Sequence, residues 1–363
     1  MSFEQTSEAL ELKRMLRKLF NDGLSIEKLL TLSQDPFGDP EKLRQKVRQQ
    51  FSQLGVDEFF EGEIVGSRPF EILAQVAFES GRALAPLPFA EELFLGKFIP
   101  AVLLDTAEAL PQLPQNTRFV PCVETVLGGL SFEQSGESAE VSGLGRGIAC
   151  GDAADAFVFL VPGFGLFGLT NPGEQQVRAV SNARKPLDGT VPRCDVEFRG
   201  ARLSLFGSPD LERVRALHFV LVAQELCGVC ERVLDLTVEY IKTRKQFGVP
   251  VGGFQAVQHK AAEMKLRFEQ MESITQFATW AAENDPAQLE FAAFAALSFC
   301  AEHAPTLAEM SIQLHGGIGF TWEYGLHLFL RRAQALSLIY SFSESETDTF
   351  LSLAERQSGI AVS

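Results

Sequence analysis

The chain has 363 residues, more than one ordinary hydrophobic core accommodates, so two or three domains are expected. Its formal net charge of −15 disfavours nucleic-acid binding, because phosphates must be neutralised by basic surface. No stretch approaches the ~20 uninterrupted apolar residues of a membrane span.

The first 117 residues are expected to form a helical domain. "SEALELKRMLRKLF" and "PFEILAQVAFESGRALA" repeat apolar residues every three or four positions. "GRALAPLPF", residues 81–89, predicts a helix end, with a glycine at the stop and two prolines that prevent continuation. The N-terminus lacks the basic start and apolar core of a signal peptide, and six scattered cysteines show no disulfide spacing. A reduced cytoplasmic location is therefore expected.

The pattern changes to short β-rich runs over residues 118–206, with "DAFVFLVPGFGLFGL" and "CDVEFRGARL" as the clearest strands. These runs predict a small antiparallel β domain, a sandwich or a barrel. Long amphipathic helices with short breaks follow over residues 207–363 and predict an up-and-down four-helix bundle. The expected fold class is thus α+β multidomain: a helical domain, an antiparallel β domain and a four-helix bundle.

Two motifs in the last region indicate an anion site. "TRKQFG" places Arg244, Lys245 and Phe247 at a helix end, where a guanidinium fits a pyrophosphate and an aromatic ring fits a flat base. "QLHGGIGFTWEYG" places several glycines between two helices, where backbone N–H groups can approach a phosphate. Each motif also has a structural interpretation, as a solvated basic helix end and as a tight turn.

Together, these motifs resemble those of the acyl-CoA dehydrogenase family. Residues 240–264 are similar to its helix–break–helix element and residues 313–333 to its glycine motif. "KPLDGTVPRCDVEFRGARL" resembles the end of its middle β domain, and "LAQVAFESGRALAPLPF" resembles its N-terminal domain. The resemblance covers essentially the whole chain in family order. The residues of the glycine motif are most similar to those of subunits of bacterial hetero-oligomeric enzymes that act on bulky acyl-CoAs, including steroid side chains.

The resemblance implies α,β-dehydrogenation of an acyl-CoA thioester on FAD, with electrons passing to an acceptor flavoprotein. The family holds FAD across a subunit interface: one subunit's β domain receives the flavin, and the neighbour's C-terminal domain contacts the ADP half. Nine residues match the neighbour's FAD-binding positions: Arg244, Gln246, Phe247, Val251, Gln255, Gln313, Leu314, Gly316 and Gly317. The expected anion is therefore the pyrophosphate of FAD on another subunit.

The β region departs from the family pattern. The Thr-Glu-Pro run and the Gly-Ser-Asp turn are absent from residues 120–157, and no Trp occurs before Trp280. The flavin-receiving face of this chain is therefore expected to be degenerate.

The family's carboxylate base is absent from both of its usual places. Counting forward from Arg331 places Tyr340 at the first position near the C-terminus. Counting back from Tyr240 places His218, followed by Phe219, at the second position. Glu344 and Glu346 reach the first place only with a gap. Glu212 and Arg213, in "DLERV", lie six positions before His218 and Phe219. Six residues span ~9 Å along a helix, too far for the base to move without remodelling. No catalytic residue is expected in this chain.

Other motifs are expected to be structural. Cys227 and Cys230 have zinc-like spacing, but without a second Cys/His pair they indicate a helix core, and no metal site is expected. "GLGRG", residues 143–147, lies in β-rich sequence and is not a dinucleotide fingerprint. His315 is expected to pack in the glycine turn.

Three hypotheses remain open from the sequence. In the first, the chain is a subunit of an α2β2 enzyme and contributes its C-terminal domain to FAD held by a homologous partner. In the second, it is a self-sufficient homo-oligomeric dehydrogenase with a relocated base such as Glu344. In the third, it is a non-catalytic binding protein on the same scaffold.

Overall fold

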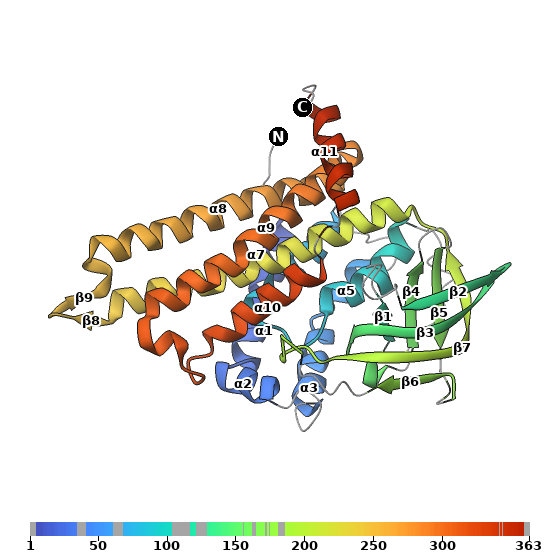
Figure 1. Ribbon diagram of the computed structural model, residues 1–363, viewed down its shortest axis with the longest axis horizontal. Helices are drawn as coiled ribbons and strands as arrows, with labels where there is room; N and C mark the ends of the chain where they lie inside the picture. Colours follow the sequence, from blue (N-terminus) through green and yellow to red (C-terminus); the bar gives the residue numbers. More distant parts are fainter. Residues whose placement is uncertain are drawn as a thin grey trace. The chain divides into compact units, whose positions relative to one another are not determined.

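A computed structural model describes residues 5–34, 41–60, 68–103, 117–120, 129–154, 156–161, 165–170, 173, 175–180, 186–340, 342 and 344–358. Helices occupy both ends of the chain and a largely antiparallel sheet lies between them in sequence, which confirms the predicted fold class (Figure 1). None of the helices in these ranges is long and apolar enough to cross a bilayer. In the same ranges, no cluster of three or more His, Cys, Asp or Glu side chains could hold a metal ion.

The N-terminal helices follow the apolar periodicity of the sequence. Their bounds are α1 Ser7–Gly23, α2 Ile26–Gln34, α3 Glu41–Ser52, η1 Val56–Phe60, α4 Pro69–Ala83, α5 Phe89–Leu93 and the π-helical η2 Phe94–Leu103. Helix α1 begins where the Thr6 hydroxyl accepts a hydrogen bond from the Ala9 N–H at 3.2 Å. Its buried residues recur every three or four positions, so one face packs inward.

The sheet contains seven strands in the order β1-β4-β5-β7-β3-β2, with β6 also paired to β7. All pairs are antiparallel except β1 with β4, which is parallel and differs from the purely antiparallel expectation. Phe198 meets both Phe157 and Phe159 edge to face in its core. The strand bounds are β1 Thr117–Val120, β2 Leu130–Ser135, β3 Ser138–Ala149, β4 Ala156–Val161, β5 Gly165–Thr170, β6 Val177–Val180 and β7 Arg193–Gly207, with η3 Gly151–Ala153 after β3.

Four long helices form the predicted bundle (Figure 1). Their bounds are α7 Leu211–Thr243, α8 Gln255–Asn284, α9 Pro286–His315 and α10 Leu326–Ile339, and α11 Glu344–Ser358 follows. Polar contacts fix α7 against its neighbours: the Thr237 and Ser311 hydroxyls lie 2.7 Å apart, and Arg332 donates to Glu225 at 2.7 Å. Cys227 and Cys230 are buried on α7, as expected for core residues.

The chain divides into two compact units. The bundle unit contains Met1–Leu30, Ala74–Leu84 and Phe219–Ser363. The sheet unit contains Thr31–Leu73 and Ala85–His218. Helices α1 and α4 therefore contribute to the core that also contains the bundle. The division into three domains at residues 117 and 206 stays a prediction.

A partly buried ion-pair network joins α1, α4 and α7 within the bundle unit. Arg17 donates to Glu79 at 2.6 Å and to Glu231 at 2.7 Å. Arg82 donates to Glu231 at 2.6 Å and to Asp235 at 3.0 Å. Each carboxylate of this network thus accepts from Arg17 or Arg82, so few carboxylate oxygens remain to pair with other cations nearby.

Two glycines let α4 and α7 approach each other closely. A Cβ at Gly81 would lie 2.0 Å from the Glu225 carbonyl oxygen, and one at Gly228 would lie 1.9 Å from the Phe78 carbonyl oxygen. The sequence predicted that Gly81 ends the helix, and this was wrong. Helix α4 continues to Ala83, and Leu84 then adopts a positive φ of 50°. Close helix packing, rather than chain reversal, requires glycine here.

We expect Gly228→Ala to lower the free energy of unfolding by about 1–3 kcal/mol, because the new methyl group would collide with backbone of α4. Urea denaturation of the purified chain measures this. Gly253→Ala is the control, since a Cβ there meets nothing within 4 Å. Equal stability of both variants would contradict the close packing.

Candidate functional site

The first part of the site is a two-residue β-hairpin that follows α7. Strands β8 Lys245–Gln246 and β9 Val249–Pro250 flank Phe247 and Gly248, whose φ angles are 52° and 84°. Two positive φ values define a type I′ turn, in which Asn, Asp or Gly normally stands first. Phe247 instead occupies that strained position, with 93% of its surface exposed. The turn thus holds an aromatic ring in solvent at a conformational cost.

Arg244 lies at the start of this hairpin and is exposed. Its backbone is fixed, since its N–H donates to the Tyr240 carbonyl and its carbonyl accepts from Val251 N–H, both at 2.8 Å. Within the described ranges, its guanidinium forms neither a hydrogen bond nor an ion pair. The group is therefore positioned by the backbone and available to an anion.

The second part of the site is the turn η5 Gly316–Phe320, between α9 and α10. Gly316 has φ 63° and ψ −143°, a conformation nearly restricted to glycine. A Cβ at Gly316 or Gly317 would meet nothing within 4 Å, so both backbones are open to a ligand. Such exposed glycine backbone suits close approach by an anion.

Stacked side chains join the two parts. The Tyr240 ring stacks on His315 with 4.4 Å between ring centroids, and His315 Nδ1 donates to the Ser311 carbonyl at 2.8 Å. Burial lowers the pKa of His315, so the ring is neutral near pH 7 and acts as packing. The expectation that His315 packs in the glycine turn is confirmed.

The nine residues predicted to bind a cofactor occupy one end of the bundle (Figure 1). Arg244, Gln246 and Phe247 belong to the α7 end and hairpin, and Val251 and Gln255 lead into α8. Gln313, Leu314, Gly316 and Gly317 lie at the α9 end and η5. Seven are exposed, whereas Val251 and Leu314 are half-buried. The structure thus groups them on one surface without closing a pocket around them.

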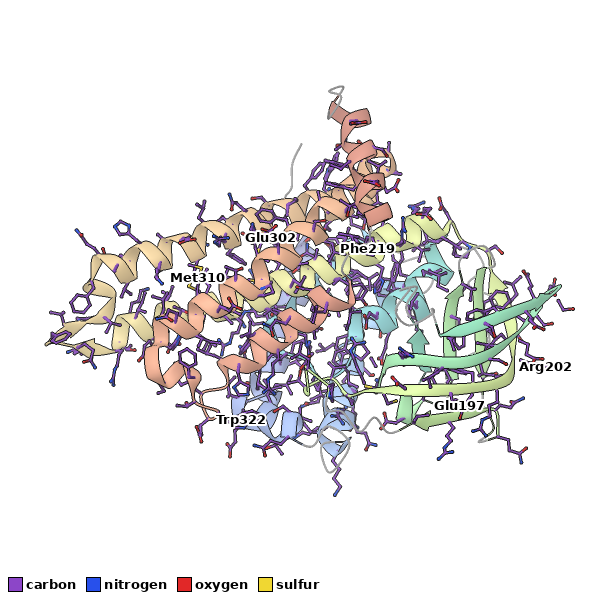
Figure 2. The ribbon with its side chains drawn as sticks, viewed as in Figure 1. Glu197, Arg202, Phe219, Glu302, Met310 and Trp322 are labelled. Carbon is purple, nitrogen blue, oxygen red and sulfur yellow. The ribbon has the colours of Figure 1, made fainter. Side chains whose placement is uncertain are left out.

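Sequence reasoning missed several exposed apolar residues that extend this surface. Phe320 is 75% exposed, and Val249, Phe254, Ile318 and Trp322 are also exposed. Trp322 lies after η5, where Arg331 packs over its ring at 5.2 Å from the centroid (Figure 2). The signal was present in "GGIGFTWE", where aromatics alternate with small residues. Contiguous exposed apolar residues of this kind mark an interaction surface.

The residues aligned with the family's base positions are buried. Tyr340, at the end of α10, is 3% exposed, and His218 on α7 is 7% exposed. His218 Nε2 lies 3.6 Å from a Glu91 carboxylate oxygen and the ring stacks near Phe94, a pair that the sequence did not predict. Glu212 is exposed and pairs with Arg215 at 2.6 Å.

The other carboxylates considered as bases lie on α11, which begins at Glu344. The side chains of Glu344 and Glu346 lie outside the described residues. Residues 121–128, part of the region with the missing β-domain motifs, lie outside them too.

The surface at the bundle end fits part of FAD. A diphosphate needs a cationic fork and open N–H groups, and an adenine needs an exposed flat ring. Arg244, the Gly316–Gly317 backbone and Phe247 provide these three elements.

The chain matches known proteins along most of its length. Residues 218–340 match the acyl-CoA dehydrogenase C-terminal domain. Acyl-CoA dehydrogenase IpdE2 of Mycobacterium tuberculosis is 31% identical over 265 residues, 72% of this chain and 70% of IpdE2. One chain of the solved ChsE4–ChsE5 complex of the same organism superposes on this chain with a TM-score of 0.79 at 20% identity. The superposition covers 100% of this chain and 100% of that chain. The chain therefore belongs to the acyl-CoA dehydrogenase family.

Another relative is longer than this chain. Acyl-CoA dehydrogenase FadE34 of Mycobacterium tuberculosis is 32% identical over 267 residues. The match covers 73% of this chain and 36% of FadE34. The chain thus aligns with about a third of that relative.

FAD is the cofactor of the family.

Proposed function

We propose that this chain is one subunit of a hetero-oligomeric FAD-dependent acyl-CoA dehydrogenase, an α2β2 assembly in which its bundle end binds FAD held by a homologous subunit. The observation that carries the proposal is Phe247, exposed and strained beside the exposed Arg244. A solvent-exposed ring in a left-handed conformation destabilises the free chain, so its benefit must come in an assembly.

Each of the nine predicted cofactor-binding residues has a role in this proposal. Arg244 binds the pyrophosphate, Phe247 packs on the adenine side, and the Gly316–Gly317 backbone donates to phosphate oxygens. Gln246, Val251, Gln255, Gln313 and Leu314 border these contacts. When bound, FAD accepts the hydride that leaves the acyl β-carbon. The substrate is a bulky acyl-CoA such as a steroid side-chain thioester, and the electrons pass on to an acceptor flavoprotein.

The partner subunit supplies the catalytic base in this proposal. The base must be a desolvated carboxylate with a tuned pKa. Tyr340 carries a phenol rather than a carboxylate, and a neutral phenol is a poor base near pH 7. Glu212 is solvated and already paired with Arg215.

We place the enzyme in the cytoplasm, because the five described cysteines are free and buried.

A second candidate function is a self-sufficient dehydrogenase whose base is His218. The specific observation is the buried His218–Glu91 pair, in which a carboxylate oxygen lies 3.6 Å from the imidazole Nε2 and can orient the ring. In this alternative, His218 accepts the α-proton and Glu91 holds the ring. The chain would then form a homo-oligomer and need no homologous partner.

Purification with and without a partner tests the main proposal. The chain expressed alone is expected to be colourless and inactive, because its own flavin-receiving face is degenerate. Co-purified from its native host with a homologous subunit, it is expected to show a flavin spectrum and acyl-CoA-dependent reduction of an electron acceptor. Yellow, active protein from the single chain would contradict the main proposal and favour the second candidate. Absence of flavin in every preparation would favour a non-catalytic scaffold.

Single substitutions in the assembled complex distinguish the two catalytic models. Replacing His218, Glu212, Glu344 or Glu346 by the matching amide or by Asn is expected to leave turnover within about tenfold, ~1.4 kcal/mol in barrier. Stopped-flow flavin reduction measures the chemical step, and flavin content with size-exclusion chromatography controls for assembly. A variant that loses flavin reduction while both controls stay normal would identify the base in this chain.

A further inference from the structure

A cavity separate from the cofactor surface lies inside the bundle unit. Its volume is about 320 Å³, at the lower end of the ~300–1,000 Å³ typical of small-molecule sites. It lies where α1, α2, α4, α7 and α10 meet. About half of its lining surface is polar. The apolar part includes Phe20, Leu24, Leu29 and Phe329, and the charged part consists of Arg82 and Arg232.

The two arginines of the cavity differ in their partners. Arg82 is buried and donates to Glu231 and Asp235, as described above. Arg232 is half-buried and, among the described residues, forms no hydrogen bond and has no carboxylate within 4.0 Å. Glu231 already serves Arg17 and Arg82, so the nearby acidic groups are occupied. Arg232 thus brings a cation without a bonded counter-ion to a cavity whose lining is part apolar and part polar.

The environment of Arg232 disfavours its charge. Burial lowers the pKa of Arg232, and the neighbouring Arg82 cation lowers it further, although Asp235 and Glu239 act in the opposite direction. The guanidinium nevertheless stays protonated at neutral pH, since the ordinary pKa of an arginine lies far above neutrality. A ligand that brings one negative charge would remove this destabilisation.

We propose that this cavity binds a small organic carboxylate with an unbranched apolar tail, with the carboxylate on Arg232 and the tail against Phe20, Leu24 and Phe329. A guanidinium recognises a carboxylate through paired hydrogen bonds. The apolar part of the lining, which includes Phe20, Leu24 and Phe329, accepts the tail, and a free phosphate has no such tail. The site is independent of the FAD surface, because it lies among α1, α2 and α4 and uses none of the nine residues at the bundle end.

Calorimetric titration of the full chain with hexanoate, acetate and 1-hexanol tests the proposal. Hexanoate is expected to bind at one site per chain. Affinity is expected to rise about fourfold per methylene from butanoate to hexanoate as the tail leaves water. Acetate, which lacks the tail, and 1-hexanol, which lacks the charge, are expected to bind at least tenfold more weakly than hexanoate. Equal affinity for hexanoate and 1-hexanol would overturn the role of Arg232.

Two variants locate the site. Arg232→Met is expected to weaken hexanoate binding at least tenfold and to raise the melting temperature of the ligand-free chain, because it removes a desolvated charge. Asn21→Trp, at an exposed lining position on α1, is expected to block the cavity and abolish binding without disturbing the core. Arg202→Met, on the exposed face of β7, is the charge-matched control and should leave binding unchanged.

The variants decide the proposal even if one of them misfolds. Hexanoate binding that survives Asn21→Trp, or that survives Arg232→Met in a folded chain, would place the ligand elsewhere and overturn the assignment. The titrations need neither flavin nor partner subunit. Their failure is therefore distinguishable from failure of the proposed dehydrogenase function.

Discussion

Replacing Arg244 with alanine is expected to weaken FAD binding by the assembled complex roughly 10- to 150-fold. The exposed guanidinium has no partner within the described part of the chain, so its loss leaves no buried carboxylate unpaired and should not unfold the bundle. A charge-assisted hydrogen bond to a pyrophosphate contributes about 1.5–3 kcal/mol, which corresponds to that range of affinity. Flavin fluorescence during titration of the apo complex measures the dissociation constant.

Two further variants test whether geometry or charge matters. Arg244→Lys keeps the charge but loses the two-pronged donor, so it is expected to recover only part of the affinity. Arg202→Ala removes the same charge from the exposed face of β7 and should leave FAD binding unchanged (Figure 2). If Arg244→Ala and Arg202→Ala bound FAD equally well, Arg244 would be a solvated helix end and no part of the cofactor site.

Much of the fold follows from local sequence patterns. Long amphipathic runs predicted α7, α8 and α9, because periodic apolar residues over thirty positions have few alternative structures. The role of Gly81 was not predictable, since its requirement arises from a helix distant in sequence. Glycine at a helix end and glycine at a helix crossing look the same in one sequence. The parallel pairing of β1 with β4 was missed for the same reason: strand direction depends on long-range pairing.

The candidate site was predictable where residue chemistry and position coincide. Arg244 and the glycines at 316 and 317 were identified from the motif, and the structure groups them on one surface. The positive φ of Phe247 was not predicted, because Phe is rarely found at that position of a type I′ turn. The His218–Glu91 pair joins residues 127 positions apart on different helices, so no local pattern could have shown it.

The strained turn predicts opposite effects on stability and on cofactor binding. Phe247→Asn is expected to raise the free energy of unfolding of the isolated chain by up to about 1 kcal/mol, because Asn tolerates a left-handed conformation that Phe does not. Little packing is lost, since the ring is 93% exposed and its nearest ring, Phe254, lies 6.3 Å away edge-on. Thermal and urea denaturation measure this gain.

The same substitution is expected to weaken FAD binding by the assembled complex about 5- to 150-fold. Stacking of an aromatic side chain on a base contributes ~1–3 kcal/mol, and Asn provides no such surface. Phe247→Ala separates the two effects: it removes the ring but keeps the Cβ, so it should lose FAD affinity without gaining the stability of Phe247→Asn. A stabilised Phe247→Asn variant that retains full FAD affinity would mean that the ring is strained for a reason other than the cofactor. Equal stability of all three chains would mean that the turn relaxes in solution. Stability gained with Asn alone, together with affinity lost in both variants, would show that this position sacrifices stability of the free chain for binding in the assembly.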